Sequence, residues 1–188
     1  MQKASNSKDI LMLLLYAKGA TGLWGESIKG RIRLMKMVFL FNKEIRKYFN
    51  LGDNIPDAAL PDFRPYDYGP FSDKVYQDLE LLVDLGFVQV KKVDGNDEEE
   101  SLESQYWQVT TDLPGDDEDS GMDEFLLTTM GKSFVKEELQ WVRPEQWDGL
   151  NKFKNRCASI TLNALLKYVY TKYPEMTTES KIRNKILK

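Results

Sequence analysis

The sequence predicts a mainly α-helical protein with a small antiparallel β-sheet, folded as a single domain over residues 1–188. A chain of 188 residues is long enough for one core and short for two, and 41% hydrophobic and 12% aromatic residues can fill that core. Apolar residues recur at helical spacing before residue 87 and after residue 129, and alternate in parts of the segment between. A helix that ends in Leu85-Gly86-Phe87-Val88 is typical of the third helix and first wing strand of a winged helix. We therefore expect a winged-helix-like core plus additional C-terminal helices.

The helical core, residues 7–86, is expected to begin with two helices. Ser7 is a suitable N-cap for the first helix, in which isoleucine and leucines recur at helical spacing between residues 10 and 15. The second helix should run from about Arg31 to Phe49, because its apolar residues follow steps of three and four and so form one stripe. The stripe consists of Leu34, Val38, Phe41, Ile45 and Tyr48.

The third helix follows a proline-rich connection. Four prolines between residues 50 and 70 deny that segment both helix continuation and strand hydrogen bonds, so it should be irregular and pinned to the core by its aromatic residues. Ser72 is a good N-cap, Phe71 can pack on Tyr76 beyond the cap, and Gly86 provides the C-terminal stop.

A winged β-hairpin is expected over residues 87–129. Phe87 to Val93 and Tyr106 to Thr111 alternate well enough to be its two strands, with an acidic loop over residues 94–103 as the tip. A second acidic loop covers residues 112–124, and Phe125 to Thr129 is a third strand candidate. Helical periodicity returns over residues 130–188, which are expected to form the C-terminal helices.

The composition excludes several kinds of catalytic and metal site. The chain has no histidine and one cysteine, Cys157, so Ser-His-Asp and Cys-His catalysis, histidine-bound metals and thiolate metal sites are excluded. We therefore expect no cofactor, no metal site and no enzymatic activity. A lone cysteine fits a reducing cytoplasm, and no apolar run reaches the roughly 18 residues of a membrane span, so we expect a cytoplasmic protein with no membrane partner.

Charge is strongly segregated along the chain. Thirteen acidic and no basic residues lie between Asp94 and Glu124, so the remainder holds 26 basic residues against 17 acidic ones, although the net charge is −4. On the second helix the basic residues lie opposite the apolar stripe, together with Phe39 and Leu40. This side is either a solvated face with two apolar residues covered by another part of the fold, or a partner-binding surface with a hydrophobic anchor ringed by cations.

The partner-binding interpretation selects residues from both charged regions. From the basic helix it takes Arg33, Lys36, Phe39, Lys43, Arg46 and Lys47. From the acidic hairpin it takes Asp97, Glu98, Glu99 and Glu100, whose charge would speed association with a cationic partner.

DNA binding is the alternative function that a winged helix suggests. The groove-facing positions of the third helix would be Asp73, Tyr76, Gln77 and Glu80, and the wing tip would be acidic, so both elements have the wrong charge for phosphates. The basic second helix could still bind phosphate in another pose. Nucleic acid is thus the second candidate partner, and a carboxylate-dependent enzyme acting on nucleic acid is a third hypothesis.

Three segments resemble one family of bacterial proteins. Residues 30–40 (GRIRLMKMVFL), 65–72 (PYDYGPFS) and 169–175 (VYTKYPE, followed by Ser180-Lys181) resemble, in order and spacing, motifs of the YwgA-like proteins and, more distantly, of the SocA-like antitoxin (Panacea) domain. The motif residues are Arg31, Leu34, Tyr66, Tyr68, Gly69, Pro70, Phe71 and Ser72. The resemblance implies a mainly helical, small-winged fold and, for the SocA-like branch, an antitoxin that neutralises a toxin by direct contact, often in phage defence. The acidic segment 94–124 is not part of that pattern.

Together these observations favour a non-enzymatic protein-binding module, antitoxin-like or a defence-associated regulator. Its partner would be a protein, either a toxin or a defence effector, contacted through the basic aromatic helix and the acidic hairpin. The alternative is a winged-helix DNA-binding transcriptional regulator.

Overall fold

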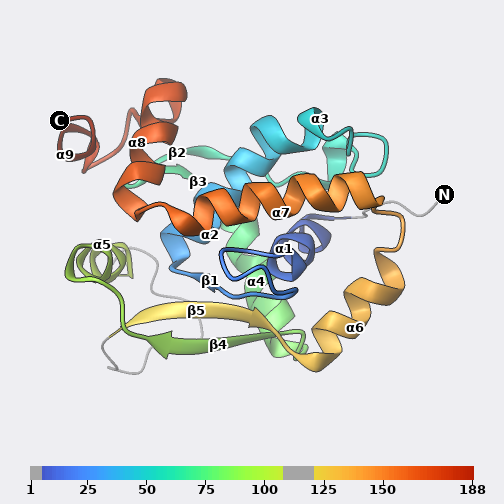
Figure 1. Ribbon diagram of the computed structural model, residues 1–188. Helices are drawn as coiled ribbons and strands as arrows, with labels where there is room; N and C mark the ends of the chain where they lie inside the picture. The colour runs from blue at the N-terminus through green and yellow to red at the C-terminus, as the bar shows by residue number, and fades with distance from the viewer. Residues whose placement is uncertain (1–5, 108–120) are drawn as a thin grey trace.

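A computed structural model describes residues 6–107 and 121–188 of the chain (Figure 1). Its helices are α1 (Ser7–Tyr16), α2 (Arg31–Leu40), α3 (Arg46–Tyr48), α4 (Asp73–Asp84), α5 (Asp97–Trp107), α6 (Thr129–Glu138), α7 (Pro144–Ser159), α8 (Leu162–Lys172) and α9 (Arg183–Ile186). The π-turn η1 (Phe41–Ile45) joins α2 to α3, and η2 (Asp57–Ala59) and η3 (Pro174–Thr177) are short 3₁₀ helices. The strands are β1 (Ile28–Lys29), β2 (Arg64–Tyr66), β3 (Gly69–Phe71), β4 (Val88–Val93) and β5 (Met122–Leu127).

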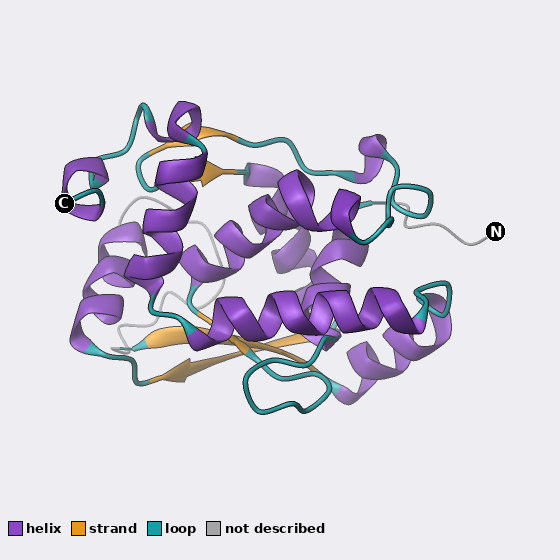
Figure 2. Cartoon of the chain, turned by 45° about the horizontal axis from the view of Figure 1, so that its top comes forward, coloured by secondary structure: helices purple, strands orange, loops and turns teal. Residues whose placement is uncertain are grey.

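The predicted fold class is confirmed. Helices α1, α2 and α4 and strands β1, β4 and β5 follow one another in the order of a winged helix, and the sheet is antiparallel with strand order β1-β5-β4. In this order β1, the first strand of the sheet along the chain, lies beside β5, the third, as in a winged helix. The sheet lies on one side of the helical body and the β2–β3 hairpin on the other (Figure 2), and α7 to α9 are the additional C-terminal helices.

Helix α1 is the centre of the core. Its side chains from Ile10 to Leu15 are at most 1% exposed, and it contacts α2, α4, α6, α7 and β5. The apolar run that predicted the first helix is therefore covered on every side. Ser7 is the first residue of α1 and not its cap, because the Asn6 side chain accepts the hydrogen bond from the Lys8 amide, at 3.0 Å.

The proline-rich connection contains a short hairpin that the sequence did not indicate. Strands β2 and β3 pair antiparallel, with Tyr66 opposite Gly69, and Pro65 opposite Pro70. The predicted start of the third helix is correct, since Ser72 occupies the N-cap position of α4 and the rings of Phe71 and Tyr76 lie 5.5 Å apart. The Ser72 side chain makes no capping hydrogen bond, however.

The expected winged hairpin is wrong in one respect. Tyr106 and Trp107 are not in a strand but end helix α5, which also takes up the acidic segment from Asp97 onward. Strand β4 pairs instead with β5, which begins at Met122, earlier than expected. The physical reason is that Leu102 and Tyr106, four residues apart, form a helical apolar face, and both are 1% exposed. Residues 108–111 and 112–120 of the predicted strand and second loop lie outside the described residues.

Candidate partner-binding surface

The basic face proposed for the second helix is mostly buried. Arg33 is 7% exposed, Lys36 0%, Phe39 0% and Arg46 8%, so four of the six residues selected from the sequence cannot meet a partner. Of that set, Lys43 and Lys47 are exposed. The expectation that Phe39 anchors a partner is thus wrong, and the alternative of apolar residues covered by another part of the fold is correct for it.

The buried cations are bound to backbone carbonyls. Arg33 Nη1 donates to Cys157 O at 2.5 Å and to Ile160 O at 2.9 Å, and so fixes the end of α7. Lys36 Nζ donates to Pro70 O at 2.9 Å, and burial lowers the pKa of its amine from 10.5 to about 7. These charges hold the C-terminal helices and the β2–β3 hairpin against α2.

The other two buried residues also pack within the fold. Phe39 makes edge-to-face contacts with Phe63 and Tyr173, at ring-centroid distances of 5.3 and 5.0 Å. Arg46 Nε donates to Ile55 O at 2.6 Å. The second helix is therefore an internal support of the domain, and its basic side is not a free surface.

The acidic residues of the predicted hairpin tip divide between solvent and the fold. Asp97 and Glu98 are exposed, whereas Glu99 turns inward. Glu99 Oε1 accepts a hydrogen bond from Leu162 N at 2.7 Å at the start of α8, and it pairs with Arg33 Nη2 at 3.1 Å. Glu100 accepts a hydrogen bond from the amide of Gly95 in the preceding loop. Half of the proposed acidic surface therefore stabilises local structure.

Glu103, one turn after Glu99, caps α2 from a distant part of the chain. Its two carboxylate oxygens accept hydrogen bonds from Arg31 N at 3.0 Å and Ile32 N at 2.9 Å. The N-cap residue Gly30 has no side chain and a φ of +91°, and a Cβ there would lie 2.7 Å from Glu103 Oε1. Burial raises the pKa of the Glu103 carboxyl from 4.5 to about 7. The sequence contains a weak signal for this cap, a glycine directly before the helix.

The family-motif residues lie in the interior. Arg31 is 2% exposed, and its Nε donates to Asp123 on β5 at 2.5 Å. Asp123 also forms an ion pair with Lys92 Nζ at 3.0 Å, so this acid of the predicted second loop belongs to the sheet. Leu34, Tyr68, Phe71 and Ser72 are between 1 and 6% exposed, Gly69 and Pro70 are buried, and Tyr66 is half-buried. These residues build a packing corner and offer little surface to a partner.

A basic groove lies on the surface between α3, α7 and the end of α8. The ribbons of α3 and α7 lie one above the other in Figure 1. The volume of the groove is about 800 Å³. We define it by its lining residues: Glu44, Ile45, Lys47, Tyr48, Phe49, Lys152, Phe153, Arg156 and Lys172. The lining thus combines four cations and one carboxylate with three aromatic side chains.

The α3 wall of the basic groove is held against α7 by close packing. A Cβ on Gly149 would lie 2.4 Å from the Phe49 ring, so only glycine lets the two helices approach this closely. Gln146 Nε2 donates to Asn50 O at 3.0 Å just beyond α3. Tyr48 projects from this wall with 78% of its surface exposed, and its ring meets Phe49 edge-on at 4.8 Å. These contacts fix the Phe49 part of the wall and leave the Tyr48 ring exposed beside it.

The charges of the basic groove are unevenly compensated. Glu44 already accepts hydrogen bonds from Tyr173 Oη at 2.7 Å and Tyr168 Oη at 3.0 Å, and pairs with Lys172 Nζ at 3.1 Å. The hydrogen bonds that Lys172 donates to Tyr168 and Glu44 raise the pKa of its amine, and burial, followed by Glu44, raises the pKa of Tyr173.

Three other cations of the basic groove, Lys47, Lys152 and Arg156, are exposed. They have no ion pair or side-chain hydrogen bond within residues 6–107 and 121–188. These are the charges that remain available to a partner.

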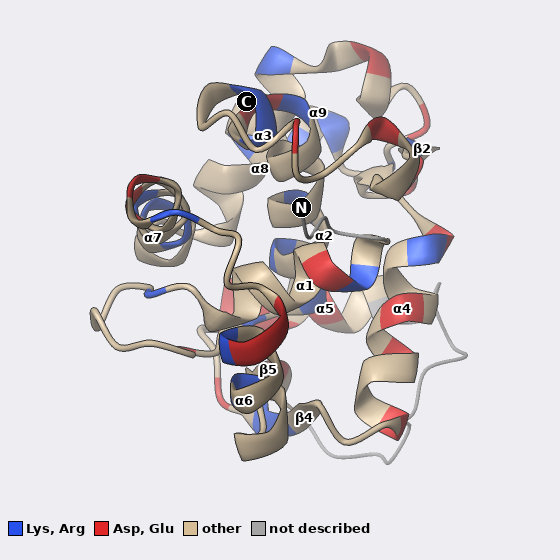
Figure 3. Cartoon of the chain, turned by 90° about the vertical axis from the view of Figure 1, so that its right-hand side faces the viewer, with Lys and Arg blue, Asp and Glu red and all other residues tan. Residues whose placement is uncertain are grey.

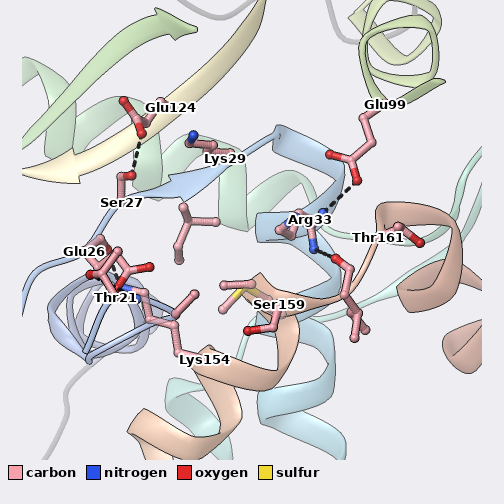
Figure 4. Close-up of a pocket in the computed structure, with 15 residues that line it drawn as sticks. Thr21, Glu26, Ser27, Lys29, Arg33, Glu99, Glu124, Lys154, Ser159 and Thr161 are labelled. Atoms are coloured by element: carbon pink, nitrogen blue, oxygen red, sulfur yellow. Dashed lines mark hydrogen bonds and ion pairs between the residues drawn. The ribbon is translucent and has the colours of Figure 1, made fainter. Parts of the chain in front are cut away.

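A second cavity, of about 620 Å³, lies where α2, α5 and the α7–α8 junction meet the loop after α1 (Figure 4). Most of its charged groups are already bound: Glu124 accepts from Ser27 Oγ at 2.6 Å, and Arg33 pairs with Glu99 at 3.1 Å, whereas Lys29 is exposed in the lining. Lys154 Nζ donates to three backbone carbonyls, among them Ala17 O at 2.8 Å. We therefore do not place the functional site in this cavity.

The outer face of α4 is acidic, as the sequence predicted, although Tyr76, expected to face outward, is 7% exposed and donates a hydrogen bond to Tyr106. Asp73, Gln77 and Asp84 are exposed there, and Lys74 is paired with the buried Asp78 (acidic positions are red in Figure 3). A helix with this outer face repels phosphates. No helix within residues 6–107 and 121–188 combines the length and the apolar character needed to cross a bilayer.

Comparisons with protein-family models, with curated proteins and with solved structures found no match to this chain.

Proposed function

We propose that the chain is a non-enzymatic protein-binding module, antitoxin-like or defence-associated, that acts in the cytoplasm. Its partner is a protein, and the basic groove is the surface that binds it. The observation that carries the proposal is the combination of Tyr48, 78% exposed, with three cations that have no partner among the described residues. Exposed aromatic side chains beside charged ones are typical of the residues that dominate protein–protein binding energy.

The chemistry of the side chains supports binding over catalysis. The sequence has no histidine, and its one thiol, Cys157, is 4% exposed. Burial raises the pKa of that thiol to about 12, so it is not a nucleophile at neutral pH. The antitoxin-like role itself rests on the resemblance of the three sequence motifs.

The winged-helix order of elements favours DNA binding as the second candidate function. Against it stand the exposed carboxylates Asp73 and Asp84 of α4, the helix that would enter the major groove. A mobility-shift series with the DNA upstream of the gene at about 50 mM salt tests this candidate, because phosphate contacts are strongest there. A shift that persists in groove variants would favour the regulator.

The protein-binding function is tested with the product of the neighbouring gene as the probe. The tagged chain and that product are co-expressed and co-purified, and growth is followed where the product is toxic. We expect Lys47→Glu/Lys152→Glu/Arg156→Glu to lose the partner. The matched control is Lys91→Glu/Lys136→Glu/Lys185→Glu, which reverses three exposed lysines elsewhere and should retain it. Equal retention by both variants would contradict the assignment of the surface.

A further inference from the structure

We infer that the basic groove takes an acidic segment of the partner protein with one aromatic or large apolar side chain between its carboxylates. This inference rests on the proposed function and specifies the partner's chemistry. It follows from the arrangement of the three available cations, from the exposed aromatic wall, and from the limits of the basic area.

The cations are spaced for carboxylates of a regular segment. Lys152 and Arg156 are four residues apart on α7, so they share one face of that helix, and Lys47 faces them from α3. Side chains at this spacing have Cβ atoms about 6 Å apart. Carboxylates three or four residues apart on a helix, or two apart in an extended chain, match that separation. Arg156 can bind a carboxylate through two parallel hydrogen bonds, which also fixes its orientation.

The aromatic wall provides the apolar half of the site. The Tyr48 ring is exposed at the groove edge, the Phe49 ring lies beside it at 4.8 Å, and Phe153 is 9% exposed in the lining. Because tyrosine has few rotatable bonds, covering its ring costs little side-chain entropy. An apolar side chain of the partner that packs on Tyr48 and Phe49 would exclude water from the neighbouring ion pairs and strengthen them.

A protein segment fits the basic groove better than nucleic acid does. The chain has a net charge of −4, and the outer face of α4 is acidic, so the overall charge of the molecule and this helix both disfavour a long polyanion. Nucleic-acid interfaces bury about 1,000–2,500 Å² and are strongly cationic throughout. Three available cations around a groove of about 800 Å³ suffice for a short segment with a few carboxylates.

The inference is tested by fluorescence anisotropy of the full chain with short fluorescein-labelled peptides. The probe has glutamates three or four residues apart around one phenylalanine. A second peptide replaces that phenylalanine with serine, a third replaces the glutamates with glutamines, and a single-stranded oligonucleotide of equal length is the fourth ligand. We expect saturable binding of the probe that weakens about tenfold between about 50 and 200 mM salt, as electrostatic association requires.

The variants and the altered peptides should weaken binding by different amounts. Lys152→Glu/Arg156→Glu and the glutamine peptide should each weaken binding at least about tenfold, and Tyr48→Ser and the serine peptide at least about threefold. The control Leu23→Ser removes an apolar side chain that is 68% exposed elsewhere and should leave binding unchanged. Tighter binding of the oligonucleotide, or equal binding of the glutamine peptide, would overturn the inference.

Failure of the inference can be told apart from failure of the proposed function. If no acidic peptide binds while the neighbouring gene product is still captured by the wild type and lost by the groove variant, the surface is right and the partner chemistry is wrong. If the groove variant also retains that partner, the proposed surface fails as well.

Discussion

Replacing Glu103 with alanine should unfold the start of α2. The Glu103 carboxylate accepts hydrogen bonds from the amides of Arg31 and Ile32, at 3.0 and 2.9 Å, and is itself 1% exposed. Without it, two buried amides lose their acceptor. The glycine before the helix has no side chain that could replace it.

The loss of stability in Glu103→Ala can be worked out from the number of buried amides that it leaves without a partner. Each unsatisfied buried amide costs about 1–3 kcal/mol, so Glu103→Ala should lower the free energy of unfolding by about 2–6 kcal/mol near pH 5. At higher pH the wild-type chain must bury an ionised carboxylate, which Glu103→Ala does not, so the variant should be less destabilised there than near pH 5. The rise in its pKa from 4.5 to about 7 corresponds to a penalty on the order of 3 kcal/mol for the ionised form.

The sign of the pH dependence follows from the same rise in pKa. Between pH 4.5 and about 7 the folded chain holds a proton on Glu103 that the unfolded chain has released. The contribution of Glu103 to stability therefore falls as pH rises through that window. Glu103→Gln keeps an acceptor oxygen and cannot ionise, so its stability should not show this decrease with rising pH.

Urea denaturation followed by tryptophan fluorescence at several pH values between about 5 and 8 measures both effects. Glu98→Ala is the matched control, because Glu98 is an exposed acid on the same helix and its loss should change stability by less than about 0.5 kcal/mol. A similarly small effect of Glu103→Ala would show that Glu103 does not cap α2, and a pH profile of Glu103→Gln equal to that of the wild type would show that Glu103 is not the titrating group.

Three further predictions concern the packing and the buried titratable groups. Gly149→Ala would place a Cβ 2.4 Å from the Phe49 ring and should cost about 1–3 kcal/mol in thermal unfolding, whereas the exposed Asp148→Ala should not. Burial lowers the pKa of Lys36 from 10.5 to about 7, so the unfolded chain binds more protons than the folded chain between these pH values, and stability rises with pH there. Urea titrations from about pH 7 to 9 should show a smaller rise in stability for Lys36→Met than for the wild type. An equal rise would count against a desolvated amine. Cys157, 4% exposed and with its pKa raised to about 12, should react with an aromatic disulfide reagent only after unfolding, and fast labelling of the native chain would contradict its burial.

The sequence was sufficient to predict the elements whose signals are local. The third helix could be placed because Ser72 marks its start, Phe71 packs on Tyr76, and Gly86 follows its end. The alternation of residues 87–93 likewise indicated β4, whereas β1 (Ile28–Lys29) was not predicted, because a strand of two residues is too short to show a periodicity. Helix α5 was missed because its apolar face, Leu102 and Tyr106, lies within a run of acids that resembles a solvated loop.

The site could be predicted only in part, because contacts between distant segments decide which faces are covered. A helical projection places Arg33 and Lys36 outward, but α7 and the β2–β3 hairpin cover them and supply the carbonyl acceptors. Lys47 was selected correctly as an exposed cation. Its companions Lys152 and Arg156 come from a helix about a hundred residues further along the chain, and no local pattern links them to α3.

Hydrogen exchange of the full chain with and without its partner tests whether the partner protein binds at the basic groove. Bound partner should slow amide exchange in the segments that form the basic groove, residues 44–49 and 152–156, because covered amides open less often. We expect protection there and no change along α4, residues 73–84. Protection confined to α4 and the β4–β5 wing, with the groove segments unchanged, would contradict it.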